Sequence, residues 1–173
     1  MAESVAAQAL APLPTIRYPN LTRLSPPPVS DSVEVMSSMD YNPLEDLRIL
    51  VVDDQRSMRS ILRRLLNEIG IRDIIEGSSG EDALEKIQIP YEKAPDLVIC
   101  DLYMEHMDGL EFSNLVRRQK VEKLAGIPIL ILTGEQDKMI VGVAKQAGAT
   151  KVLSKPISAP ELKIEISAAI GFG

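Results

Sequence analysis

The sequence predicts an α/β fold: a doubly wound parallel sheet of five strands, in the order 2-1-3-4-5, with helices on both faces. Short runs rich in Val, Ile and Leu alternate five times with amphipathic helical patterns after residue 46. Such alternation is typical of parallel sheets whose crossover helices cover both faces. The 173 residues are 45% hydrophobic and 25% charged, which fits one globular domain with additional chain.

The expected strands are short, apolar and rich in β-branched residues, as buried parallel strands require. The first is a Leu-Arg-Ile-Leu-Val-Val run, and the fourth is nearly pure Ile and Leu, whereas the fifth is weaker. The five strands are residues 47–52, 71–76, 96–100, 128–132 and 150–154.

The expected helices show apolar residues three or four positions apart. Glycines favour helix ends at Gly70 and Gly148, and the Ser79 hydroxyl suits a helix N-terminus. The helices are residues 58–69, 79–87, a third that opens at Gly109, residues 136–147, and a last one that begins at Ser158 or Ala159.

Residues 1–46 differ in composition from the rest of the chain. They hold seven of the 12 Pro residues, and all 10 Gly residues come after them. We expect a Pro-rich, mostly disordered N-terminal extension over 1–46 and the folded domain over 47–173. A tail without its own function is favoured over a partner-binding arm, and a translation start at Met36 or Met39 stays open.

Composition excludes several classes of function. A net charge of −6 and 3% aromatic residues disfavour nucleic-acid binding. One Cys excludes disulfides and Cys-based zinc sites. We expect no membrane span, because no run of about 18 apolar residues exists. The N-terminus does not resemble a secretory signal, so we expect a cytoplasmic protein.

Polar residues follow four of the five expected strands. Asp53 and Asp54 follow the first strand, Asp101 the third, Thr133 the fourth and Lys155 the fifth. Ligands of open α/β sheets bind outside the carboxyl ends of the strands, where the strand order reverses. We therefore expect these side chains to form one site.

Charge repulsion among three carboxylates predicts a metal ion at this site. Oxygen ligands favour Mg²⁺, with Mn²⁺ as the alternative, over zinc. The three carboxylates and the Lys155 ammonium leave two negative charges, which a divalent cation neutralises. A phosphoryl group on Asp101 would upset that balance and require the Thr133 hydroxyl and Lys155 as new donors.

Each of these residues has a simpler interpretation when it is considered alone. Asp53 and Asp54 fit a helix N-terminus, and Asp101 fits an ordinary loop. Thr133 fits a helix cap and Lys155 a solvated surface position. Only the combination favours a site.

Other side chains are interpreted as structural. His106, the sole His, is favoured as a loop residue over a phosphate relay or a metal ligand. Cys100 is expected to be a buried core thiol. Four Arg residues of the first helix are favoured as a solvated face over a partner surface; they are Arg56, Arg59, Arg63 and Arg64.

The order Asp-Asp, Asp, Thr, Lys-Pro over residues 47–170 resembles the receiver domain of bacterial two-component response regulators. It is similar to the single-domain, CheY-like kind, which has a flavodoxin-like (βα)5 fold. The resemblance implies that Asp101 accepts phosphate from a phosphohistidine and that Thr133 contacts the phosphoryl group and relays the switch. It implies that Lys155 pairs with Asp101 or its phosphate and precedes a cis Pro156. The implied Mg²⁺ ligands are Asp53, Asp54, Asp101 and the Tyr103 backbone carbonyl.

The resemblance also implies partners and output. The expected partners are a sensor histidine kinase or a histidine phosphotransfer protein and a downstream target, in chemotaxis or another relay. The target is expected on the face formed by residues 136–147, the strand 150–154 and the last helix. We expect self-phosphorylation and autodephosphorylation only, with no enzymatic turnover of an outside substrate. We expect a monomer or a phosphorylation-dependent dimer, without a C-terminal DNA-binding domain because the sequence ends soon after the last helix.

Three departures from the family pattern and one alternative remain. Glu105 stands where the family often has Pro, and Val152 where it often has an aromatic switch residue. Tyr103 and Glu135 occupy variable positions that in the family tune phosphate lifetime.

The alternative is a haloacid-dehalogenase-like hydrolase with Asp101 as the nucleophile. Tyr103 disfavours it, since those enzymes carry a second Asp at that position, and no substrate-binding cap domain is evident.

Overall fold

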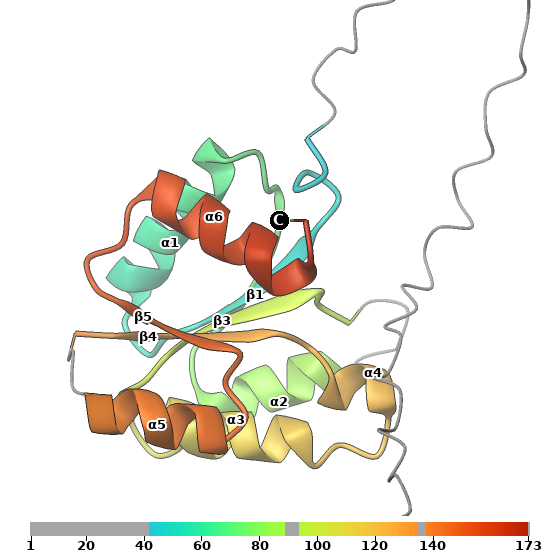
Figure 1. The fold of residues 1–173 in the computed structure, drawn as a ribbon, viewed down its shortest axis with the longest axis vertical. Coiled ribbons are helices and arrows are strands. Elements are labelled where there is room, and N and C mark those ends of the chain that lie inside the picture. The colour runs from blue at the N-terminus through green and yellow to red at the C-terminus, as the bar shows by residue number, and fades with distance from the viewer. Residues whose placement is uncertain (1–41, 89–93, 135–137, 173) are drawn as a thin grey trace, which may run out of the picture. The chain divides into compact units, whose positions relative to one another are not determined.

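The structure, a computed structural model, describes residues 42–88, 94–134 and 138–172, and these form a five-stranded sheet (Figure 1). All neighbouring strands are parallel, in the order β2-β1-β3-β4-β5. The strands are β1 (Arg48–Val52), β2 (Asp73–Gly77), β3 (Leu97–Asp101), β4 (Ile129–Thr133) and β5 (Lys151–Ser154). The predicted fold class and strand order are confirmed.

Helices cover both faces of the sheet. In Figure 1, α1 and α6 lie on one face, and α2, α3 and α5 lie on the other, with the short α4 beside them. The helices are α1 (Arg56–Glu68), α2 (Gly80–Gln88), α3 (Gly109–Arg117), α4 (Glu122–Ala125), α5 (Lys138–Gln146) and α6 (Ala159–Ile170).

Two apolar layers hold the sheet between the helices. Along β1, Ile49 and Val51 belong to the layer under α1 and α6, whereas Leu50 and Val52 belong to the layer over α2 and α3. All four side chains are fully buried. Burial of both faces explains why the strands are continuous apolar runs instead of alternating patterns.

The second strand begins two residues later than predicted. Ile71 is buried, but its N–H donates to the Leu66 carbonyl, and the Gly70 N–H donates to the Asn67 carbonyl. This pair of bonds, with Gly70 at a positive φ of 98°, is a Schellman motif that ends α1. The apolar character of Ile71 therefore reflects the helix end, where that residue packs back on the last turn.

The short helix α4 was not predicted. It has only four residues, and its single buried side chain is Leu124. One apolar position cannot produce a helical period, so the sequence carried no signal for it.

Residues 42–46, which the sequence assigned to the extension, form a turn against the domain. The Asn42 side-chain amide donates to the Ile69 carbonyl over 2.9 Å, and Leu44 is 1% exposed. The rest of the expected extension, residues 1–41, lies outside the described residues, as do residues 136–137 of the expected fourth helix. Within the described ranges, none of the helices is long and apolar enough to cross a membrane.

Candidate functional site

The polar residues singled out from the sequence lie at the carboxyl ends of the central strands. Asp53 follows β1, and Asp101 and Thr133 are the last residues of β3 and β4. Lys155 follows β5, whose Ser154 is in register with Thr133. Because β1, β3, β4 and β5 are parallel neighbours, their ends share one edge of the sheet.

The three carboxyl groups converge. One carboxylate oxygen each from Asp53, Asp54 and Asp101 lies within 4.8 Å of the others. Asp53 and Asp101 are buried, as is the neighbouring Thr133. Burial raises the pKa of Asp53 above its ordinary value, and the charge of Asp101 adds to this, whereas the Gln55 N–H and Lys155 oppose it. The predicted acidic cluster therefore exists and is electrostatically costly.

Lys155 partly balances this charge. Its Nζ lies 2.7 Å from Oδ1 of Asp101 and 3.5 Å from Oδ2 of Asp53. The Lys155 N–H donates to the Thr133 carbonyl over 2.7 Å, which fixes the chain where it leaves the sheet. The peptide bond to Pro156 is cis, as the resemblance implied.

Asp54 indicates where a cation would fit. Its Oδ2 accepts a hydrogen bond of 3.0 Å from the Glu105 N–H. Its Oδ1 is buried and has no hydrogen-bond partner among the described residues. A buried carboxylate oxygen without a donor is unfavourable, and the donor set around it consists of oxygens that suit Mg²⁺. The residues therefore fit a hard divalent cation.

The connection from β3 to α3 contacts the acidic cluster through the Glu105 N–H and leads directly into a capped helix. The Asp108 carboxylate caps α3 by accepting from the N–H groups of Leu110 and Glu111. The Gly109 N–H donates to the Leu102 carbonyl, and this brings α3 against the end of β3. Tyr103 lies on this connection and is 54% exposed.

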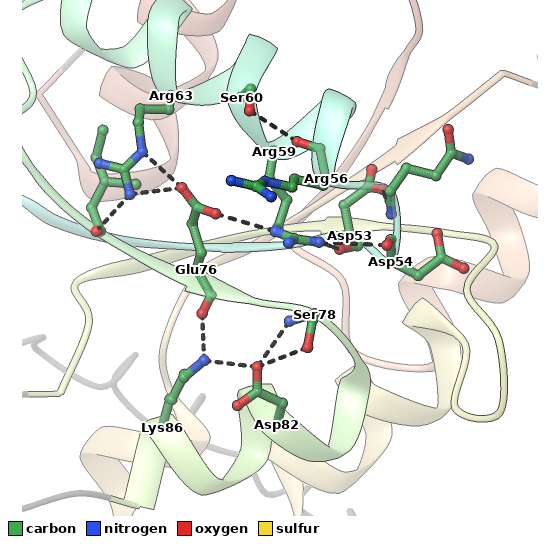
Figure 2. A network of polar contacts seen from close by, with 12 residues as sticks. Asp53, Asp54, Arg56, Arg59, Ser60, Arg63, Glu76, Ser78, Asp82 and Lys86 are labelled. Carbon is green, nitrogen blue, oxygen red and sulfur yellow. Dashed lines mark hydrogen bonds and ion pairs between the residues drawn. The ribbon is translucent and has the colours of Figure 1, made fainter.

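Sequence reasoning missed the contacts among three charged residues beside the acidic turn, which are Arg59, Arg63 and Glu76. The Arg59 side chain is 13% exposed, so its interpretation as a solvated residue was wrong. Its Nη1 lies 2.8 Å from the Asp53 carbonyl oxygen, and its Nε lies 3.2 Å from Glu76 (Figure 2). Arg63 also binds Glu76, at 2.7 Å. The available signal was the spacing of four between the two Arg residues, with an acid near the end of the neighbouring strand.

The remaining residues singled out from the sequence lie around the site. His106 lies in the β3–α3 connection with a positive φ of 65°, and the only group of potential metal ligands found in the described residues does not include it. Cys100 is buried as predicted, and burial raises the pKa of its thiol well above the ordinary value. Val152 packs against the core in β5. Glu135 lies outside the described residues.

Comparisons with known proteins agree with this arrangement. A family model described as "Response regulator receiver domain" matches residues 49–167. The chain is 35% identical over 127 residues to a protein of Rhizobium etli named "Probable chemotaxis protein CheY", covering 73% of this chain and 95% of that protein. It is 33% identical to the "Alkaline phosphatase synthesis transcriptional regulatory protein PhoP" of Bacillus subtilis, covering 70% of this chain and 47% of that protein. The solved structure of Vibrio cholerae chemotaxis protein CheY4 superposes with a TM-score of 0.64 at 31% identity, covering 71% of this chain and 98% of that one.

Proposed function

The chain belongs to the response regulator receiver domain family, which accepts phosphoryl groups in two-component signalling, and from this premise we propose that Asp101 is its phosphoryl acceptor. The observation that carries the proposal is the place of Asp101, at the end of a central strand and inside the acidic cluster. Lys155 binds one oxygen of its carboxylate over 2.7 Å. The proposed donor is a phosphohistidine on a sensor kinase or a phosphotransfer protein.

In the proposed reaction, a carboxylate oxygen of Asp101 attacks phosphorus. A P–O bond forms as the P–N bond of the donor breaks, and the electron pair of that bond goes to the imidazole nitrogen. Lys155 is placed to balance the charge on Asp101 before transfer and on its phosphoryl group afterwards. Thr133, buried at the end of β4, is the proposed hydroxyl contact that relays the change.

The proposed cation site consists of Asp53, Asp54, Asp101 and the Tyr103 backbone carbonyl. Receiver domains generally bind Mg²⁺ at an acidic pocket, and the orphaned Oδ1 of Asp54 supports such a site here. When bound, the cation would supply positive charge against the phosphoryl oxygens. The chain's own carboxylates hold it, and Lys155 completes the charge balance.

The proposed output is contact with a downstream protein. The proposed face comprises α5, β5 and α6, which present the exposed apolar side chains of Met139, Val143 and Ile164. Chemotaxis and transcription both occur among the names of its relatives, so this proposal names no pathway. Self-phosphorylation by small donors, autodephosphorylation, a cytoplasmic location and a monomer or phosphorylation-dependent dimer remain parts of the proposal.

Acetyl phosphate tests the acceptor assignment. We expect Asp101→Asn to lose labelling in the presence of Mg²⁺, because the amide oxygen is a poor nucleophile, while its circular dichroism spectrum stays unchanged. Asp108→Asn is the matched control, since Asn also caps helices and Asp108 lies in the same connection. Thr133→Ala should keep the label, as Thr133 is not the acceptor. Persistent labelling of Asp101→Asn at another residue would contradict the assignment.

A further inference from the structure

We propose that Arg59 is a positioning residue, which holds the Asp53–Asp54 turn in its cation-binding orientation by binding the backbone of the turn and not its carboxylates. The inference rests on the proposed function, because it concerns the same cation site. It adds a residue of α1 that does not touch the cation.

Arg59 contacts the backbone of the turn directly. Its Nη1 donates to the Asp53 carbonyl over 2.8 Å and lies 3.5 Å from the Asp54 carbonyl oxygen. Figure 2 shows its guanidinium group between the turn and Glu76. A charged donor on a partly buried carbonyl forms a stronger hydrogen bond than a neutral donor does. The contact therefore resists rotation of the peptide units that carry the two carboxylates.

The carboxylate side of the turn is fixed separately. Oδ1 of Asp53 accepts from the Gln55 N–H over 2.8 Å, and the Asp53 N–H donates to the Gly77 carbonyl. The backbone of Asp53 is thus held by β2 at its N–H and by Arg59 at its carbonyl. Loss of Arg59 would remove the second of these two restraints, the one at the Asp53 carbonyl.

Glu76 fixes the orientation of Arg59. Its Oε2 accepts from Nε of Arg59, and its Oε1 accepts from Arg63. Burial alone raises the pKa of Glu76, but hydrogen bonds from Arg63 and Arg59 outweigh this and hold the pKa below its ordinary value. Glu76 therefore stays charged and anchors both guanidinium groups.

Two effects of Arg59 on cation affinity have opposite signs. Its positive charge repels a cation, so its removal would tighten binding if repulsion dominated. Its hydrogen bonds position the ligands, so its removal would weaken binding if positioning dominated. The charge of Arg59 is paired with Glu76 at 3.2 Å, which reduces the repulsion. We therefore expect the positioning effect to be the larger.

Arg63 provides a matched control. It has the same charge and the same partner, Glu76, and its second contact is with the Ile74 carbonyl at 3.5 Å. Of these two Arg residues, only Arg59 is hydrogen-bonded to the acidic turn within the part of the chain that the structure describes. Arg63→Gln thus removes the same charge from α1 without removing the restraint on Asp53.

The test measures Mn²⁺ binding by the full chain. Electron paramagnetic resonance monitors the binding, and Mg²⁺ serves as the competitor. We expect Arg59→Gln to weaken Mn²⁺ binding about 10-fold. This is the lower end of the range for mutation of residues that hydrogen-bond to metal ligands. Arg63→Gln should stay within about two-fold of the unmodified chain, because exposed charges act weakly. Arg59→Lys should fall between them, since Lys keeps the charge but cannot bind Glu76 and the turn together. Urea unfolding of every variant checks that the fold is retained.

The outcomes distinguish a failure of the positioning role of Arg59 from a failure of the proposed cation site. Tighter or unchanged binding in Arg59→Gln overturns the positioning role, as does an equal loss in Arg63→Gln. If Arg59→Gln does not fold, Arg59→Lys decides, and affinity equal to that of the unmodified chain then overturns the role. If the unmodified chain binds no Mn²⁺, or Asp54→Ala binds as well as it does, the proposed cation site itself fails.

Discussion

Gly109 shows how closely single atoms are packed behind the acceptor. A Cβ at this position would lie 2.4 Å from the backbone carbonyl oxygen of Asp101, well inside van der Waals contact. That carbonyl belongs to the last residue of β3 and cannot move without moving the Asp101 side chain. Glycine is therefore required here for close approach, since only its missing Cβ lets α3 begin against the strand end.

At the residue scale, we predict that Gly109→Ala destabilises the domain by about 1–3 kcal/mol, as overpacked sites do. It should also weaken Mn²⁺ binding, because the clash displaces the strand end that carries Asp101. Urea unfolding and a Mn²⁺ titration measure the two effects.

Gly142 is the matched control for this substitution. It lies in α5, and apart from its chain neighbours and the backbone of its own helix, a Cβ at this position would meet no atom of the described residues within 4 Å. Gly142→Ala should therefore stabilise the domain by about 0.5–1 kcal/mol through its higher helix propensity. Equal effects of the two substitutions on the free energy of unfolding would show that helix propensity, and not contact with Asp101, determines the effect of Gly109→Ala.

At the scale of elements, Arg117 joins α3 to the two connections that lead into β4 and β5. From the last turn of α3 its guanidinium donates to the carbonyls of Ala125 and Ile127 near the start of β4. It also donates to the carbonyl of Gly148, which precedes β5. Burial lowers the pKa of this guanidinium, yet the group remains charged at neutral pH. One side chain thus fixes the entry into two strands whose far ends carry Thr133 and Lys155.

We predict that Arg117→Met destabilises the domain by about 2–4 kcal/mol, because three partly buried carbonyls lose a charged donor while the apolar stem is kept. Arg118→Met, at the neighbouring position, should change stability by no more than about 0.5 kcal/mol, because the Arg118 side chain does not join these connections. The measurement is the urea midpoint at an unchanged m-value. A small effect of Arg117→Met would mean that water replaces the guanidinium at these carbonyls.

Elements were predictable from the sequence where one local signal sufficed. The apolar runs identified all five strands, and the residues directly after them identified the acidic cluster, because parallel strands end at one edge. Ser158 shows the same for a helix start, since it forms a capping box with Glu161. The four-residue α4 and the helix-ending role of Ile71 lacked such a signal.

Contacts between side chains of different elements were not predictable in the same way. Arg59 reaches Glu76 and the Asp53 carbonyl only because α1, β1 and β2 are packed in one particular arrangement. From the sequence alone, an Arg beside apolar helix positions fits a solvated face equally well. The same applies to Arg117, whose three carbonyl partners lie 8 to 31 positions away along the chain.

At the scale of the whole molecule, charge repulsion in the acidic cluster destabilises the fold, although the proposed function requires the cluster. Asp53 and Asp54 lie between β1 and α1, whereas Asp101 ends β3, so their repulsion acts across the middle of the sheet. Lys155 ties the end of β5 to the same group. A cation that binds only the folded arrangement must stabilise the domain by mass action.

We therefore predict that Mg²⁺ raises the unfolding temperature of the full chain by several degrees. At 100 times the dissociation constant, the stabilisation is about 2.7 kcal/mol. Asp54→Ala should lose this shift, because it removes the carboxylate whose Oδ1 is buried without a partner among the described residues. Without Mg²⁺, the same variant should unfold at or above the temperature of the unmodified chain, since one repelling charge has gone. Calorimetry with NaCl at matched ionic strength separates binding from general screening. An equal shift with NaCl, or a full Mg²⁺ shift in Asp54→Ala, would show that the cluster does not couple a cation to folding.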